Sequence, residues 1–193
     1  MKKILLISAH LLIANILIAQ NNEIEKSIFN IQTGLLGTWI SNESRLTDQI
    51  ALRSELGLDA AIFGGQRFGS TKIYFAPVLT IEPRWYYNFA KRTSKNRYTA
   101  NNSLNFFTIT TSYHPDWFII PNNIINVENQ ISIIPKWGIR RTLFQSKFHY
   151  ECGIGIGYER FISSNASNNG SVAIDIHLRI GFNFKINVKN IIK

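Results

Sequence analysis

The chain has 193 residues, enough for one domain, with a formal net charge of +9 and a single cysteine, Cys152. One thiol excludes an internal disulfide and a cysteine-based metal cluster. Because the N-terminus indicates an exported chain, we expect its basic excess to meet lipid phosphate and not nucleic acid.

Residues 1–19 have the pattern of a secretory signal peptide. Met1-Lys2-Lys3 is a short basic region, residues 4–19 are an apolar run, and Ala19 is small enough for a cleavage site. The run is short for a membrane-spanning helix, which needs about 20 residues. We therefore expect the following division of the chain: a cleaved signal peptide over 1–19, a short N-terminal segment over 20–27, a folded domain over 28–184 and a C-terminal tail over 185–193.

Alternation of apolar and polar residues predicts strands along the folded domain. In chain order these are residues 28–40, 50–63, 72–89, 104–113, a short stretch at 117–120, 129–140, 148–161 and 174–184. The last is a perfect period of two from Ile174 to Phe184, which places every apolar side chain on one face. Pro77, Pro83 and Pro135 interrupt the strands and are expected at bulges or beyond the bilayer.

No segment after Ala19 resembles a transmembrane helix, so insertion into lipid would use strands, and only a closed barrel then satisfies every backbone group. Bacterial single-chain barrels have an even number of strands and both chain ends in the periplasm. The sequence therefore predicts an all-β fold, an antiparallel up-and-down transmembrane β-barrel of eight strands. The expected extracellular loops are 41–49, 90–103, 121–127 and 163–170, and the expected periplasmic turns are 64–71, 114–115 and 141–147.

Alternation alone does not say which face is inside, because a soluble lipocalin-like barrel alternates with its apolar face inward. Two features favour the membrane arrangement. Aromatic residues of the apolar face, Trp39 and Trp85 among them, gather near strand ends as interfacial girdles do. The polar face carries six cations and six anions, and a confined interior needs such neutrality. The predicted lumen charge network is Arg53, Glu55, Asp59, Lys72, Glu82, Arg84, Lys136, Arg140, Glu151, Glu159, Asp175 and Arg179.

The loop over 90–103 contains a basic run without an acid. Lys91, Arg92, Lys95 and Arg97 could attract lipid phosphate or acidic glycans at the outer leaflet, and Tyr98 could stack on a sugar. A solvated loop explains the same residues without a ligand, and both interpretations stay open.

Four stretches resemble one family: residues 82–88 (EPRWYYN), 112–118 (SYHPDWF), 133–141 (IIPKWGIRR) and 177–182 (HLRIGF). They look like small outer-membrane β-barrel proteins of Bacteroidota, and the resemblance covers about residues 28–185. It implies the fold and a location in the outer membrane of a Gram-negative bacterium, but no reaction and no catalytic residue. The tail after residue 184 departs from the family, whose barrels often end at the final aromatic.

No motif points to a reaction. The histidines after the signal segment, His114, His149 and His177, show no metal-ligand spacing, and the chain has no G-x-S-x-G motif. We therefore expect no catalytic residue, no cofactor and no metal.

The first hypothesis is a non-enzymatic, monomeric envelope protein with a salt-bridged, plugged lumen and a role in surface interaction. Its expected partners are outer-membrane lipid, lipopolysaccharide and, during biogenesis, periplasmic chaperones and the barrel-assembly machinery. One alternative is a lipid A-modifying acyltransferase or deacylase, which needs a serine, a histidine and an acid within hydrogen-bond reach at one rim. The other is a soluble periplasmic binding barrel, which needs an apolar cavity and a charged exterior.

Overall fold

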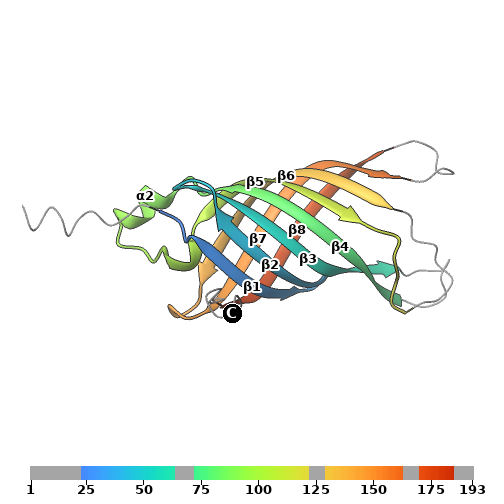
Figure 1. Cartoon of the computed structure of the whole chain (residues 1–193), viewed down its shortest axis with the longest axis horizontal. Coiled ribbons are helices and arrows are strands. Elements are labelled where there is room, and N and C mark those ends of the chain that lie inside the picture. The colour runs from blue at the N-terminus through green and yellow to red at the C-terminus, as the bar shows by residue number, and fades with distance from the viewer. Residues whose placement is uncertain (1–22, 64–71, 122–128, 163–169, 185–193) are drawn as a thin grey trace, which may run out of the picture.

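The computed structural model describes residues 23–63, 72–121, 129–162 and 170–184. Within them the chain forms eight antiparallel strands, each paired with the next, and β1 pairs with β8 to close the barrel (Figure 1). The all-β, up-and-down barrel that the sequence predicts is thereby confirmed. The strands are β1 (Ser27–Gly34), β2 (Gly37–Arg45), β3 (Ile50–Phe63), β4 (Lys72–Trp85), β5 (Asn105–His114), β6 (Gln130–Thr142), β7 (Phe148–Phe161) and β8 (Ser171–Phe184).

In the described ranges, the little helical structure lies in one connection. Helix α2 (Phe89–Thr93) and the short turn η1 (Ala100–Asn102) both stand between β4 and β5. Among the described residues, no helix is long and apolar enough to cross a membrane. The predicted signal peptide at 1–19, residues 20–22 of the next segment and the tail at 185–193 lie outside the described residues.

The predicted strand count is right, but two of the predicted strands are wrong. Residues 28–40 form parts of two strands, β1 and β2, joined by a hairpin at Leu35 and Leu36. These leucines lack the Asn, Asp or Gly that usually indicates a tight turn. Residues 117–120 form no strand and contribute a single bridge, between Ile120 and Phe75.

Gly37, directly after the β1–β2 hairpin turn, adopts a backbone conformation that favours glycine. Its φ of 144° is a conformation that side chains rarely adopt, and a Cβ there would lie 2.1 Å from the backbone oxygen of Leu58. The reversal also moves Trp39 to the inner face, where it is 5% exposed. The prediction that Trp39 belongs to an outer aromatic girdle is therefore wrong.

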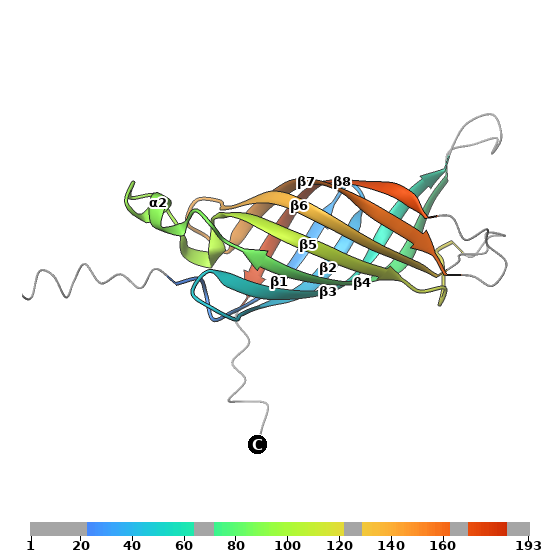
Figure 2. The ribbon, with the colours of Figure 1, turned by 90° about the horizontal axis from the view of Figure 1, so that it is seen from above.

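The barrel has two distinct ends (Figure 2). At the terminal end, β1 begins, β8 ends, and residues 46–49, 86–104 and 143–147 connect strands. At the distal end the connections are residues 35–36, 64–71, 115–129 and 162–170. The sequence grouped the loops 41–49 and 90–103 with 121–127 and 163–170, and this grouping is wrong. Because the β1–β2 hairpin was not predicted, every connection from 41–49 onward was placed at the wrong end of the barrel. The strand wrongly predicted at 117–120 added one reversal, so the connections after it were again placed at the right end.

The outer wall of the barrel is apolar and its interior is charged. Ile156 and Ile176 point outward and are 63% and 64% exposed, whereas Arg53 and Glu151 point inward and are fully buried. This arrangement follows the period of two along each strand. It is the opposite of what a soluble ligand-binding barrel needs.

Two of the three strand prolines, Pro83 and Pro135, are exposed on the outer wall at gaps in the ladders, whereas Pro77 is buried. Pairing between β4 and β5 skips Pro83, and pairing between β6 and β7 skips Pro135, with the same register on either side. Pro77 lies beyond the last pair of β4 with β5, at Leu79. Because the register does not change, the expected bulges at Pro83 and Pro135 are absent and the cost is limited to local hydrogen bonds.

A small apolar core closes the terminal end. Its side chains come from the segment before β1, from β3 and β5, and from the α2 connection: Ile24, Ala51, Tyr86, Phe89, Leu104 and Phe106. Phe106 lies directly beneath a charged group, since the Arg84 guanidinium stands 4.2 Å from its ring centre. The core therefore separates the charged interior from the loops at this end.

Candidate functional site in the barrel interior

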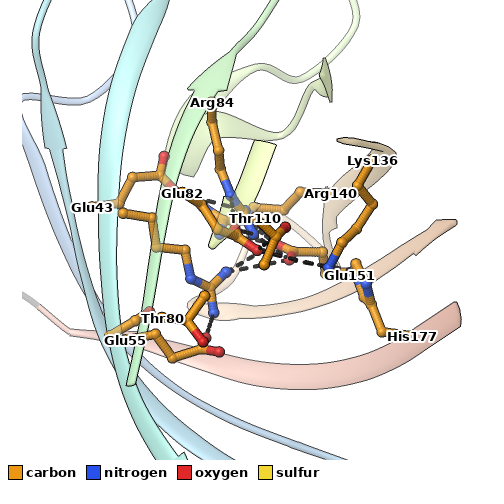
Figure 3. A network of polar contacts seen from close by, with 12 residues as sticks. Glu43, Glu55, Thr80, Glu82, Arg84, Thr110, Lys136, Arg140, Glu151 and His177 are labelled. Carbon is orange, nitrogen blue, oxygen red and sulfur yellow. Dashed lines mark hydrogen bonds and ion pairs between the residues drawn. The ribbon is translucent and has the colours of Figure 1, made fainter. Parts of the chain in front are cut away.

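Glu151 on β7 is the centre of a buried ion-pair network (Figure 3). Arg84 on β4 donates to both carboxylate oxygens, with Nη1–Oε2 and Nη2–Oε1 distances of 2.9 and 2.8 Å. Arg140 on β6 donates through Nε at 2.9 Å, and Arg53 on β3 through Nη1 at 3.2 Å. One carboxylate thus ties together four strands, and such charge-assisted, forked pairs are the stronger kind of hydrogen bond.

Glu82, beside Arg84 on β4, extends the network toward β5, β6 and β8. It accepts hydrogen bonds from Arg84 Nε at 2.7 Å and from the Thr110 hydroxyl at 2.9 Å. Lys136 Nζ lies 3.8 Å from Glu82 and 2.6 Å from Asp175. A lysine on β6 therefore joins acids on β4 and β8.

Glu43 on β2 extends the network toward the terminal end. It lies 3.1 Å from Arg140 Nη1 and accepts a hydrogen bond from the Tyr86 hydroxyl at 2.8 Å. The Asn102 amide donates to the same oxygen. Asn102 and Tyr86 belong to the connection that carries α2, so these bonds fasten that connection to the barrel interior.

Glu55 on β3 extends the network toward the distal end. It pairs with Arg53 and accepts from Arg179 Nη1 on β8 at 2.9 Å. The Arg179 guanidinium also stacks 3.8 Å from the Trp39 ring centre. Trp39, moved inside by the hairpin, is therefore part of the packing around the charges.

Ten ionised side chains are joined in this way, five of each sign, and a buried ion is tolerated only when it is paired. Nine of them are in the set that the sequence proposed: Arg53, Glu55, Glu82, Arg84, Lys136, Arg140, Glu151, Asp175 and Arg179. The tenth is Glu43, which the sequence placed in a loop because β2 was not recognised. The side chain of Lys72, also proposed, lies outside what the structure describes.

Asp59 and Glu159 do not join the network, contrary to prediction, because they lie nearer the distal end. Asp59 accepts hydrogen bonds from Trp39 Nε1 at 2.7 Å and pairs with His114 Nε2 at 2.9 Å. Glu159 accepts from Gln130 Nε2 at 2.8 Å. Both acids line a cavity of about 430 Å³ at this end.

The basic loop is placed differently from the prediction. Lys91, Lys95 and Arg97 are exposed, and Arg92 and Tyr98 are half-buried, all at the terminal end. The loop therefore stands at the end of the barrel where β1 begins and β8 ends. The prediction put this loop and the chain ends at opposite ends of the barrel, and that placement is wrong.

The ion pairs of the interior satisfy the network carboxylates that the structure describes there. Each carboxylate of the network is paired with at least one cation, and the described residues contain no group of three or more His, Cys, Asp or Glu placed to hold a metal. The arrangement therefore favours a structural role, that of a plug across the lumen.

Comparison of the chain with protein-family models, with curated proteins and with solved structures gives no match. The function is therefore argued from the geometry of the barrel itself.

Proposed function

We propose that the protein is a non-enzymatic β-barrel of the outer membrane, with a lumen closed by ion pairs and a role in the cell envelope. The observation that carries the proposal is the inverted polarity of the barrel. Apolar side chains such as Ile156 and Ile176 stand exposed around its wall, while Arg53, Arg84 and Glu151 are buried. In water, so large an apolar surface would be unusual for a monomeric protein, whereas hydrocarbon solvates it.

The closed lumen is supported by two features in series along the barrel axis. The ion pairs centred on Glu151 join side chains from opposite walls, and the apolar core that contains Phe89 and Phe106 covers the terminal end. The interior of an eight-stranded barrel is narrow enough for its own side chains to fill. We therefore infer that the protein does not conduct ions.

The even strand number supports an orientation with both termini in the periplasm. The distal end then meets lipopolysaccharide, and the terminal end meets the phospholipid leaflet and the periplasm. Export by the segment 1–19, and delivery by periplasmic chaperones to the barrel-assembly machinery, belong to the same proposal.

The lone thiol offers a direct test. Cys152 lies on the outward face of β7, paired with Ile139 of β6 and Leu178 of β8, and is the only cysteine of the chain. In protein folded into lipid vesicles, we expect a charged, membrane-impermeant maleimide to label Cys152 only after unfolding. The matched control carries Cys152→Ser and Lys147→Cys, which moves the thiol to the exposed connection before β7.

Equal labelling of the two thiols in the folded, vesicle-associated protein would refute the membrane assignment. A second measurement is independent of labelling. Folded membrane barrels are expected to migrate differently on a gel before and after boiling, and co-fractionation with the outer membrane is expected in the native host.

One specific observation favours the enzymatic alternative. His114 and Asp59 form a pair at the distal end, and Ser112 lies on the same inner face of β5 and lines the same cavity. The Ser112 hydroxyl, however, is hydrogen-bonded to Thr80 at 3.0 Å. A lipid A-modifying activity predicts a mass change in lipid A incubated with the protein, abolished by His114→Ala. We expect no such change.

A further inference from the structure

Three arginines gather on the outer surface of the terminal end and form what we call the arginine cluster: Arg92 in α2, Arg97 in the turn that follows, and Arg141 near the end of β6. The Arg97 amide donates to the Arg92 carbonyl at 2.9 Å. Burial lowers the pKa of Arg92, and the neighbouring Arg97 guanidinium lowers it further. Asn105 joins Arg141 to the start of α2: its backbone amide donates to the Asn88 side-chain oxygen at 2.9 Å, and its own side-chain oxygen accepts a hydrogen bond from Arg141. Burial lowers the pKa of Arg141, and the charge of Arg92 lowers it further.

The cluster has no counter-charge in the part of the chain that the structure describes. Arg92 Nη2 donates to the backbone oxygen of Tyr98 at 2.9 Å, and Arg141 Nη1 donates to that of Arg140 at 2.6 Å. Arg141 Nη2 donates to the Asn105 side-chain oxygen. All these acceptors are neutral, whereas the interior arginines each face a carboxylate. Like charges held together without an acid are stabilised by a bound anion.

The cluster adjoins a belt of aromatic side chains on the outer wall. The rings of Trp85, Tyr87 and Phe107 lie 5.1–6.3 Å apart. The Tyr87 hydroxyl accepts hydrogen bonds from Trp137 Nε1 at 2.9 Å and from Asn105 Nδ2 at 3.2 Å. Asn105 therefore bridges the belt and the cluster. Aromatic belts mark the level of the lipid headgroups in membrane barrels.

We propose that the arginine cluster binds the phosphate of a phospholipid in the leaflet at the terminal end of the barrel. The proposal rests on the proposed membrane location and deepens it. A guanidinium presents a planar fork of donors that matches phosphate oxygens, and a cluster of three neutralises the headgroup at the level where it lies. The acyl chains then follow the apolar wall beside Tyr150, the register partner of Arg141.

The test compares two charge-matched double variants of the full chain. Arg92→Gln with Arg141→Gln removes two charges from the cluster, and Lys91→Gln with Lys95→Gln removes two exposed charges from the same surface. Phosphatidylglycerol is added to the protein in detergent, and the bound lipid is counted by native mass spectrometry. We expect the arginine variant to bind about tenfold more weakly than wild type, and the lysine variant to match wild type.

Equal binding by all three proteins would overturn the proposal, as would an equal loss in the lysine variant, since the effect would then be one of net charge. Stronger retention of lipopolysaccharide than of phosphatidylglycerol would overturn the choice of leaflet. Arg92→Lys with Arg141→Lys keeps the charge without the fork, and undiminished binding would contradict recognition by geometry.

The maleimide assay at Cys152 separates this inference from the proposed function, and migration before and after boiling shows whether each variant has folded. If Cys152 is protected in vesicles and no lipid is retained, the inference alone fails. If Cys152 is labelled freely, both fail.

Discussion

Replacing Glu151 by glutamine tests the reasoning about the barrel interior most directly. The side chain is fully buried and faces three buried guanidiniums, of Arg53, Arg84 and Arg140. Glutamine keeps the shape but removes the charge, so the network changes from neutral to one uncompensated positive charge. Breaking a buried pair in this way costs about 3–5 kcal/mol. Each arginine keeps another carboxylate within 4 Å, which places the expected loss toward the lower part of that range.

The assay is urea unfolding in detergent or lipid, followed by the fluorescence of the four tryptophans. With a slope of about 2 kcal/mol per molar urea, the midpoint should fall by roughly 2 M. The matched control is Glu159→Gln, on the same strand and the same inner face. Glu159 is half-exposed and accepts hydrogen bonds from Gln130 and Ser171, so we expect a change within about 0.5 kcal/mol.

A double variant isolates the charge effect. Glu151→Gln with Arg140→Gln makes the network neutral again, and the pair should be less destabilising than the sum of the single changes by about 1–3 kcal/mol. If Glu151→Gln proves as stable as Glu159→Gln, the network does not stabilise the barrel and the argument from buried charge is refuted.

Three further predictions concern the hairpin, the outer wall and the lumen. Gly37→Ala should lower the free energy of unfolding in the same urea titration by about 1–3 kcal/mol, because alanine is strained at its φ of 144°; an unchanged midpoint would contradict this. Ile176→Lys should cost about 2–4 kcal/mol in lipid vesicles if the wall faces hydrocarbon, and an unaffected vesicle titration would count against that. Wild-type protein in a planar bilayer should show no ion conductance, and stepwise currents that follow its insertion would contradict a closed lumen.

The fold class could be predicted from alternation because each strand has one face in each environment. The polarity of the barrel needed two further observations, the aromatic residues near strand ends and the balanced charges of the polar face. The run from Ile174 to Phe184 needs no tertiary information, since every second residue is apolar. The β1–β2 hairpin could not be found in this way. Its turn consists of Leu35 and Leu36, whose side chains are exposed on the outside, so the apolar pattern continues through the reversal. In that stretch, only the flanking glycines, Gly34 and Gly37, indicate a turn.

Because the turn at Leu35 and Leu36 was not predicted, Glu43 was left out of the predicted ion-pair network. The predicted loop over 41–49 contains this residue, although its carboxylate is fully buried against Arg140. Charge balance along the strands could not reveal the error, because the predicted set is neutral without Glu43. Its six anions include Asp59 and Glu159, and its six cations include Lys72. Asp59 and Glu159 are on the inner face but lie toward the distal end. Alternation with a period of two tells which face of a strand a residue is on, but not how far along the barrel axis it lies.

The same depth argument explains where the net charge goes. The interior network is neutral, so the excess of positive charge lies at the ends of the barrel. Most of it lies at the terminal end, because the strand connections that contain the basic residues are there. In the part of the chain that the structure describes, the segment before β1, the connections and the strand ends at the terminal end carry eight cations against three acids. An asymmetry of this kind fits a surface that meets lipid phosphate on one side of a membrane, and it follows from where the strands reverse. The cations are Lys26, Arg45, Lys91, Arg92, Lys95, Arg97, Arg141 and Lys147, and the acids are Glu23, Glu25 and Asp48.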